Sequence, residues 1–194
     1  MKLVIAWLLR VALELAPYEK APQFPGHEEQ PWQRRDRVAQ IAKAIALRVD
    51  LEPALDGLTK AQSAALVLAL AVEETELALD ADEGPCFRGV WQGRSWAWRC
   101  DGGLAVGVLQ IHVPLRDRAE YFAHRGKVLA VGYRHLRRAL LAKCRPDDRL
   151  AVLARGCRDA RSVLGSRKVF ALWRQALAMG PAPEWPTPEA EPVG

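Results

Sequence analysis

The 194-residue chain contains no apolar run long enough to cross a bilayer. A membrane-spanning helix requires about 20 consecutive apolar residues, whereas the N-terminal run Leu3–Leu9 is interrupted by Arg10. We therefore expect no stable membrane insertion, and we interpret residues 2–16 as an amphipathic helix of the folded domain. The alternatives for this segment are a weak export signal and a helix that lies on a membrane surface.

Cysteine is scarce and is confined to the second half of the chain, at Cys86, Cys100, Cys144 and Cys157. No two of these residues form a C-x-x-C pair, so we expect neither a zinc site nor another metal or cofactor. If neighbours pair, Cys86 with Cys100 and Cys144 with Cys157, two short loops close and an oxidising compartment is indicated. Four buried thiols are the alternative, and the sequence leaves both open.

Clusters of β-branched residues and alternating apolar runs are few, and no internal repeat is found. Alanine, leucine, arginine and valine dominate instead, which favours a mainly α-helical fold. Half of the residues are hydrophobic and 26% are charged, the balance of a globular chain. The length suits one domain of ordinary size with a single core.

Basic residues outnumber acidic ones, 28 to 23, which gives a net charge of +5 and a pI near 9.2. Such a charge predicts attraction to a polyanion: nucleic acid, anionic lipid or the bacterial cell wall. Two basic runs, RRDR at 34–37 and RHLRR at 134–138, are interpreted as solvated helix faces. They would hold the protein against an anionic wall or, alternatively, against phosphates.

Apolar residues at helical spacing predict the long helices. A helix over 34–49 carries its apolar residues on one face: Val38, Ile41, Ile45 and Val49. Thr59 is a suitable N-cap for a helix over 60–76, which is apolar almost all round and should be the central, buried one. Further helices are expected over 105–112, 116–124, 127–144 and 148–155, and from a Ser166 cap to residue 179.

The helical pattern breaks over residues 78–103. The run GPCFRGVWQGRSWAWRCDGG contains five glycines, three tryptophans and two cysteines, which is typical of a loop or a short antiparallel hairpin. Its tryptophans, Trp91, Trp96 and Trp98, alternate with polar and basic residues. This interleaving suits stacking on sugars or on an anionic polymer, and a small hydrophobic hairpin core is the alternative.

Two short segments carry the candidate chemistry. LALAVEETEL at 68–77 ends an apolar helix in Glu73 and Glu74, and LAVGVLQIHV at 104–113 places Gln110 in an apolar segment. A carboxylate buried at the end of an apolar helix has a raised pKa and can keep a proton to donate. Glu73 and Glu74 lie about 100° apart on a helix and cannot share a direction. The alternative is that both glutamates close a helix that faces solvent and that Gln110 is a surface residue.

Together, LAVEETEL and AVGVLQIHVP resemble the catalytic core of the lytic transglycosylase and goose-type lysozyme superfamily. In this alignment Glu74 takes the place of the catalytic glutamate and Thr75 that of the following serine. The second motif falls on Gly107, Val108, Leu109, Gln110 and Ile111. The later run AVGYRHLRRALLAKCRPDDRLAVLARG resembles the helix pair after the cleft, so that the resemblance covers about residues 58–160. Where the family has Ala-Tyr-Asn-x-Gly, this chain reads AVLARG at 151–156.

The resemblance implies a mainly α, lysozyme-like helical domain with a buried central helix and a small loop or β-hairpin insertion at the cleft. Residues 58–179 would form this catalytic domain, residues 1–57 a helical extension packed on it, and residues 180–194 a Pro-rich flexible tail. The implied function is a peptidoglycan lytic enzyme with Glu74 as general acid and base. Thr75, Gly107, Gln110 and Ile111 would bind substrate.

The route of cleavage depends on whether a second carboxylate takes part. A lytic transglycosylase needs none and leaves 1,6-anhydro products, whereas a hydrolase needs a partner at a set distance. The candidates for that partner are Asp80, Asp82, Glu83 and Asp101. We expect the transglycosylase route, with a hydrolytic lysozyme as the alternative.

The expected partners are peptidoglycan glycan strands and, for a phage-encoded enzyme, virion components; no nucleic acid is expected. The expected place of action is the bacterial cell wall or periplasm. Two other hypotheses are a non-catalytic phage structural protein that retains the fold and a basic helical module that binds nucleic acid.

Overall fold

The fold is built around one buried helix, α3 (Lys60–Thr75). The structure is a computed structural model that describes residues 1–23, 28–52, 55, 58–84, 86, 90–91, 96–97, 100, 105–141, 160–180 and 182–186. Over these residues it is mainly helical, as predicted. Thr59 caps α3 as expected, because its hydroxyl accepts a hydrogen bond from the Gln62 amide at 3.1 Å. Every residue of α3 from Ala64 to Val72 is buried, so the prediction of a central buried helix is confirmed.

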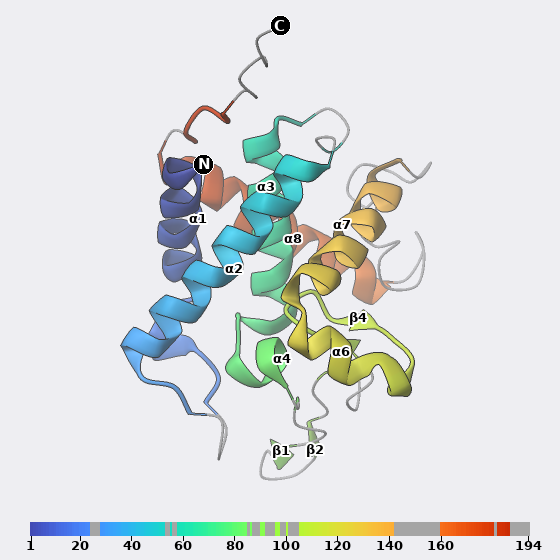
Figure 1. The fold of residues 1–194 in the computed structure, drawn as a ribbon. Coiled ribbons are helices and arrows are strands. Elements are labelled where there is room, and N and C mark those ends of the chain that lie inside the picture. The colour runs from blue at the N-terminus through green and yellow to red at the C-terminus, as the bar shows by residue number, and fades with distance from the viewer. Residues whose placement is uncertain are drawn as a thin grey trace, which may run out of the picture.

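Two N-terminal helices, α1 (Lys2–Leu15) and α2 (Pro31–Leu51), pack on each other and on α3 (Figure 1). The apolar face predicted for α2 is completely buried. The helix begins three residues earlier than predicted because Pro31 suits the first helical position and Gln30 and Gln33 form a capping box. Both helices share one core with α3.

Two further long helices, α7 (Arg125–Leu141) and α8 (Ala160–Ala178), complete the helical part of the fold (Figure 1). Helix α8 packs along α3, and α7 packs on α2. The prediction that Ser166 caps the last helix is wrong, because α8 already begins at Ala160 and Ser166 lies in its interior. The helix expected over 148–155 and the pair Cys144 and Cys157 lie outside the described residues.

Short elements connect α3 to α7. They are α4 (Leu79–Glu83), the paired strands β1 (Val90–Trp91) and β2 (Trp96–Ala97), the paired strands β3 (Ala105–Val106) and β4 (Ile111–His112), the 3-10 turn η2 (Leu115–Asp117) and α6 (Arg118–Ala123). The antiparallel β1–β2 pairing, with Trp91 opposite Trp96, confirms the predicted hairpin. Trp98 lies outside the described residues.

The helix predicted over 105–112 is instead a second antiparallel hairpin, with Ala105 opposite His112 and Val106 opposite Ile111. Its turn places Gly107 and Gln110 in the left-handed region, at φ 67° and 46°. Left-handed residues end a right-handed helix, so the apolar run folds back on itself.

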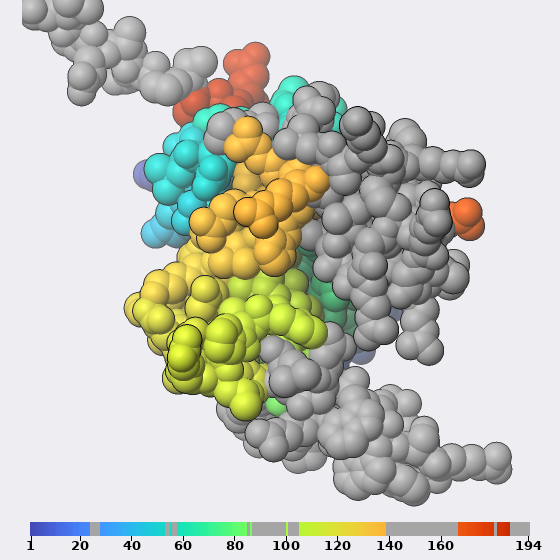
Figure 2. Space-filling model, turned by 90° about the vertical axis from the view of Figure 1, so that its right-hand side faces the viewer, coloured from blue at the N-terminus to red at the C-terminus, as the bar shows by residue number. Residues whose placement is uncertain are grey.

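Helix α7 and the segment that precedes it form a continuous part of the surface shown in Figure 2. The prediction of a solvated basic face is confirmed here, because Arg134, His135, Arg137 and Arg138 are exposed. Leu136, between them in sequence, is fully buried in the core.

Part of the C-terminal tail is anchored. The Trp185 indole donates a hydrogen bond to the Asp50 carboxylate at 2.8 Å, and the Lys60 ammonium lies 6.0 Å from the Trp185 ring centroid. The aromatic side chain of Trp185 thus joins residues 182–186 to the ends of α2 and α3, and the flexibility of the tail stays a prediction.

Candidate functional site

The candidate site is the C-terminal end of α3, where the buried helix reaches the surface. Glu74 is exposed, Glu73 is half-buried and Thr75 is buried. The expectation that burial by the protein desolvates the Glu74 carboxylate is therefore wrong for the protein without substrate. The physical reason is geometric: α3 is enclosed on all sides only up to Val72.

The chain reverses immediately after this helix end. Glu76 and Leu77 both adopt left-handed backbone conformations, at φ 50° and 53°. For residues other than glycine this conformation costs about 1–2 kcal/mol each. It is held by buried arginines, because Arg34 donates to the Glu76 and Leu77 carbonyls, both at 3.0 Å, and Arg37 donates to the Leu77 carbonyl at 2.7 Å.

The same two arginines belong to a buried ion-pair network. Glu29 accepts hydrogen bonds from Arg34 at 3.2 Å and from Arg37 at 2.6 Å. Asp82 of α4 accepts from Arg37 at 3.2 Å and from Arg125 of α7 at 2.6 Å. The start of α2, α4 and α7 therefore meet beside the end of α3.

The carboxylates of this network act on the pKa values of its arginines. Burial works to lower the pKa of Arg37, but hydrogen bonds and charges from Glu29 and Asp82 outweigh it and raise that pKa. Burial also works to lower the pKa of Arg125, but the hydrogen bond and the charge of Asp82 outweigh burial and raise that pKa. At Arg34 burial prevails and lowers the pKa of the guanidinium below its usual value.

Sequence reasoning missed this network. The prediction that RRDR at 34–37 is a solvated face is wrong for Arg34 and Arg37, which are 1% and 4% exposed. A signal was present, since Arg34 and Arg37 extend the buried stripe of Val38, Ile41 and Ile45 at helical spacing. The other two residues of the run, Arg35 and Asp36, are exposed.

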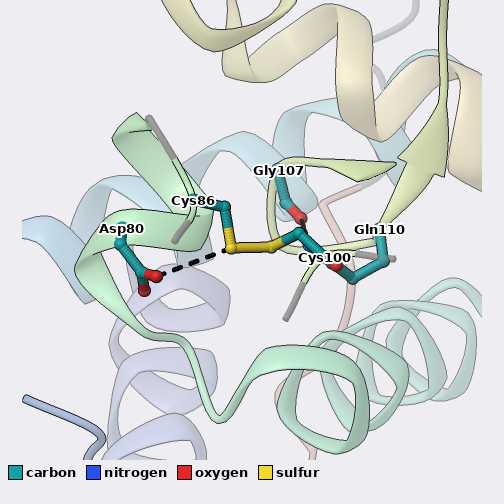
Figure 3. The surroundings of a disulfide bond; sticks show 5 residues. All are labelled: Asp80, Cys86, Cys100, Gly107 and Gln110. Carbon is teal, nitrogen blue, oxygen red and sulfur yellow. Dashed lines mark hydrogen bonds between the residues drawn. A yellow bond between two sulfur atoms is a disulfide. The ribbon is translucent and has the colours of Figure 1, made fainter. Parts of the chain in front are cut away.

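The second motif forms the turn between β3 and β4. Gln110 closes it, because its backbone amide and its side-chain amide donate to the Gly107 carbonyl at 3.0 and 2.9 Å. A Cβ atom at Gly107 would lie 2.5 Å from Val128 Cγ1, so only glycine fits. Figure 3 shows Gln110 folded back toward Gly107 in this way.

A disulfide joins Cys86, just after α4, to Cys100, just before β3 (Figure 3). This bond confirms the predicted pairing of Cys86 with Cys100; the pairing of Cys144 with Cys157 stays a prediction. The fully buried Asp80 carboxylate lies 3.5 Å from Cys86 Sγ. Because a disulfide sulfur has no hydrogen to donate, this is a packing contact of the polarisable sulfur with the carboxylate.

The expected substrate-binding residues differ in exposure. Thr75 is buried and its hydroxyl donates to the Ala71 carbonyl at 2.9 Å. The side chain of Ile111 belongs to the core, and the substrate-binding roles of both residues stay predictions. Gly107 is buried, and Gln110 is half-buried at the turn. Of the predicted residues, Glu74 and Gln110 are therefore the ones that reach the surface.

The family that the sequence resembles places a tyrosine near its catalytic glutamate. Tyr133 does not take that place beside Glu74. Tyr133 is fully buried, burial raises its pKa, and its hydroxyl is hydrogen-bonded to Ser63. Ser63 and Glu74 are eleven residues apart on α3, or about 16 Å along the helix axis. Residues 151–156 themselves lie outside the described part of the chain.

A hollow of about 360 Å³ opens beside the end of α3. Its apolar surface comes from the last turn of α1, from α3 and from α8, and its charged side chains are Lys20, Glu73, Glu76 and Lys168. The Lys168 ammonium lies 3.1 Å from a Glu73 carboxylate oxygen. Glu74 does not line this hollow.

Within the described residues, no three metal-binding side chains gather. In the same part of the chain no helix has the length and hydrophobicity that a bilayer crossing requires. No family model matches the chain, and no curated protein or solved structure matches it either. The resemblance to lytic transglycosylases and goose-type lysozymes therefore stays a prediction from the sequence.

Proposed function

We propose that the protein cleaves the β-1,4 bond between N-acetylmuramic acid and N-acetylglucosamine in peptidoglycan, on a lysozyme-like domain. The observation that carries the proposal is the placement of Glu74. It is an exposed carboxylate in the last turn of the central buried helix, next to a strained reversal that buried arginines hold. Strained backbone concentrates at functional sites.

Because Glu74 is exposed, the bound substrate has to remove water from its carboxylate. A general acid must keep its proton until the leaving oxygen needs it, and α3 alone does not remove water from this carboxylate. The glycan strand must therefore cover Glu74 when it binds, since closure of a site by its ligand excludes water.

The buried aspartates support a route with a single carboxylate. Asp82 is 4% exposed and is bound by Arg37 and Arg125, and Asp80 is completely buried. Neither is placed to activate a water molecule at a bound sugar. Glu83 remains as a half-exposed candidate for a hydrolytic alternative, and Asp101 lies outside the described residues.

In this route Glu74 first gives its proton to the glycosidic oxygen as the bond from that oxygen to C1 of the muramyl sugar breaks. The ionised Glu74 then takes the proton of the same sugar's C6 hydroxyl, and the C6 oxygen forms a bond to C1. The product carries a 1,6-anhydro ring, no water is consumed, and Glu74 ends protonated as it began.

The testing experiment replaces Glu74 by glutamine, which has nearly the same shape and no proton to give. We expect the rate of lysis of chloroform-permeabilised Gram-negative cells to fall by at least about 100-fold, with an unchanged circular dichroism spectrum. Glu14→Gln, at another exposed helical glutamate, is the matched control and should lyse like the wild type. Wild-type activity in Glu74→Gln would refute the assignment.

Glu73→Gln tests the register. We expect it to lose less activity than Glu74→Gln, because Glu73 is paired with Lys168 and turned toward the hollow. If Glu73→Gln is the inactive variant and Glu74→Gln is active, the catalytic carboxylate is Glu73.

A non-catalytic phage structural protein with the same fold is the second candidate. It is favoured by the sequence AVLARG at 151–156, which lacks the tyrosine and asparagine of the resembling family. In that case wild-type protein releases no soluble muropeptides from purified peptidoglycan.

A further inference from the structure

The hollow beside the end of α3 is held in shape by a side chain behind it. Arg34 donates to the Ala16 carbonyl at 2.8 Å and to the Glu76 carbonyl at 3.0 Å. Ala16 ends α1, Glu76 ends α3, and both line the hollow. Because Arg34 is 1% exposed and is also paired with Glu29, the two walls are fixed relative to each other.

Glu76 occupies an unusual position on this wall. The left-handed residue after a helix is usually glycine or asparagine, because a Cβ atom is disfavoured there. A glutamate at φ 50° is retained at a cost in backbone energy, and a strained residue of this kind suggests a role for its side chain. Its carboxylate is exposed at the hollow.

Charges of both signs surround the opening. Glu73 and Glu76 supply two carboxylates, and the carbonyl ends of α1 and α3 add partial negative charge. Lys20 of the segment after α1 and Lys168 of α8 supply two ammonium groups, of which Lys168 is paired with Glu73 at 3.1 Å. The hollow therefore has no preference for a simple anion or a simple cation, but it complements a ligand that carries an ammonium group and a carboxylate together.

The floor and the volume suit a small organic ligand. Leu15, Val72 and Leu172 provide apolar surface between the charged groups, against which the methylene groups of a ligand can pack. A volume of about 360 Å³ lies at the lower end of the range for small-molecule sites, about 300–1,000 Å³.

We propose that this hollow binds the zwitterionic end of the short peptide attached to a peptidoglycan strand, an inference that rests on the proposed function. Glu73 and Glu74 are consecutive, and their side chains point about 100° apart around α3. A peptide attached to the sugar at Glu74 would therefore pass around the end of the helix to bring its terminal residue to the hollow. The ammonium group faces Glu76 and the paired Glu73, and the carboxylate faces Lys20 and the paired Lys168.

The probe is the tripeptide L-Ala-γ-D-Glu-meso-diaminopimelate, whose terminal side chain carries an ammonium group and a carboxylate on one carbon. Binding to the full-length protein is measured by isothermal titration calorimetry at low salt and again at 0.5 M salt. We expect saturable binding that weakens at high salt, because exposed charges are screened. A second probe with that amine acetylated should bind at least about threefold more weakly, as expected for loss of one exposed ion pair.

Two double variants distinguish binding in the hollow from binding to positive charge elsewhere on the surface. Lys20→Ala with Lys168→Ala should weaken binding of the free tripeptide about three- to tenfold, the effect of two exposed charges. Lys43→Ala with Lys127→Ala removes the same charge from exposed lysines on other helices and should bind like the wild type. Glu74→Gln should also bind the tripeptide like the wild type, because Glu74 does not line the hollow.

The outcomes distinguish this inference from the proposed function. If the wild type does not bind the tripeptide, or if both lysine double variants bind equally, the inference is overturned whatever Glu74→Gln does to lysis. If the tripeptide binds as expected while Glu74→Gln still lyses cells, the catalytic assignment fails and the peptide site stands.

Discussion

Arg34 and Arg37 differ from the exposed Arg134 and Arg137 only in what packs around them. All four lie on helices in strongly basic runs. Burial of a guanidinium is unfavourable unless carboxylates and carbonyls replace its water, and for Arg34 and Arg37 those groups come from Glu29, from α4 and from the end of α3. The charge of a residue thus says little about its exposure when its partners are distant in sequence.

Asp82→Asn tests the residue-level role of the network. Removing one charge leaves the buried Arg37 and the half-buried Arg125 without full compensation, and we expect the free energy of unfolding to fall by about 3 kcal/mol. We expect the rate of peptidoglycan cleavage per folded molecule to fall less than about tenfold, because the Asp82 carboxylate is bound by the two arginines. Urea unfolding and product release below the transition measure the two quantities.

The matched control for that variant is Asp36→Asn, at an exposed aspartate between the two buried arginines. It should leave both stability and rate unchanged. A stable but inactive Asp82→Asn would instead make Asp82 a catalytic carboxylate and favour hydrolysis.

At the scale of elements, the disulfide fixes how α4 and the β3–β4 hairpin lie together. Cys86, Cys100, Ala78, Ala81 and Ala105 form a small cluster separate from the main core. Because that cluster is small, the covalent bond carries much of the attachment between α4 and β3.

Reduction of Cys86–Cys100 should therefore loosen this region before the helices unfold. Closing a loop of 14 residues contributes about 3 kcal/mol by restricting the unfolded chain. We expect amide exchange to quicken in residues 78–86 and 105–112 on reduction, with little change in α1, α2 and α3. Titration of the denatured, unreduced protein should find at most two reactive thiols, and four would contradict the bond.

The attachment of the tail to α2 should depend on pH. The hydrogen bond from Trp185 and, after it, the Lys60 ammonium lower the pKa of Asp50 below 3.8. A lowered pKa in the folded state means that the interaction is fully present above pH 3.8 and is lost as the pH falls through the lower, folded value. The indole N–H resonance of Trp185, assigned with Trp185→Phe, should therefore shift on acidification in this range.

Trp173 provides the internal control for that titration. Its indole donates to the Gln62 backbone carbonyl at 3.0 Å, which does not ionise. A Trp185 resonance that moves no more than that of Trp173 would show that the tail is not held by Asp50.

At the scale of the whole molecule, the products decide which reaction takes place. With Asp80 buried and Asp82 occupied, we expect wild-type protein to release 1,6-anhydromuramyl products from purified peptidoglycan. Mass spectrometry distinguishes them from hydrolytic products, because the anhydro form is lighter by one water. Reducing-end products together with an inactive Glu83→Gln would make the protein a hydrolytic lysozyme.

The helices followed from local information. The apolar stripe of α2, the Thr59 cap and the all-round apolar surface of α3 each depend on residues within a few turns, and their periodicity is visible without a partner. The β3–β4 hairpin was not predicted, because the apolar pattern of residues 105–112 fits a short helix as well as it fits a hairpin. The left-handed Gly107 and Gln110 and the contact of Gly107 with Val128 select the hairpin.

Periodicity and capping signals were enough to predict a mainly helical chain with one apolar helix at its centre and two glutamates at the end of that helix. Which side chains are buried at that end depends on the tertiary structure. It exposed Glu74, turned Thr75 inward, buried Arg34 and Arg37, and brought Lys168 to Glu73 across the hollow. The physical reason is that helix periodicity depends on neighbours in sequence. Burial of a charge, in contrast, depends on groups that distant segments bring to it.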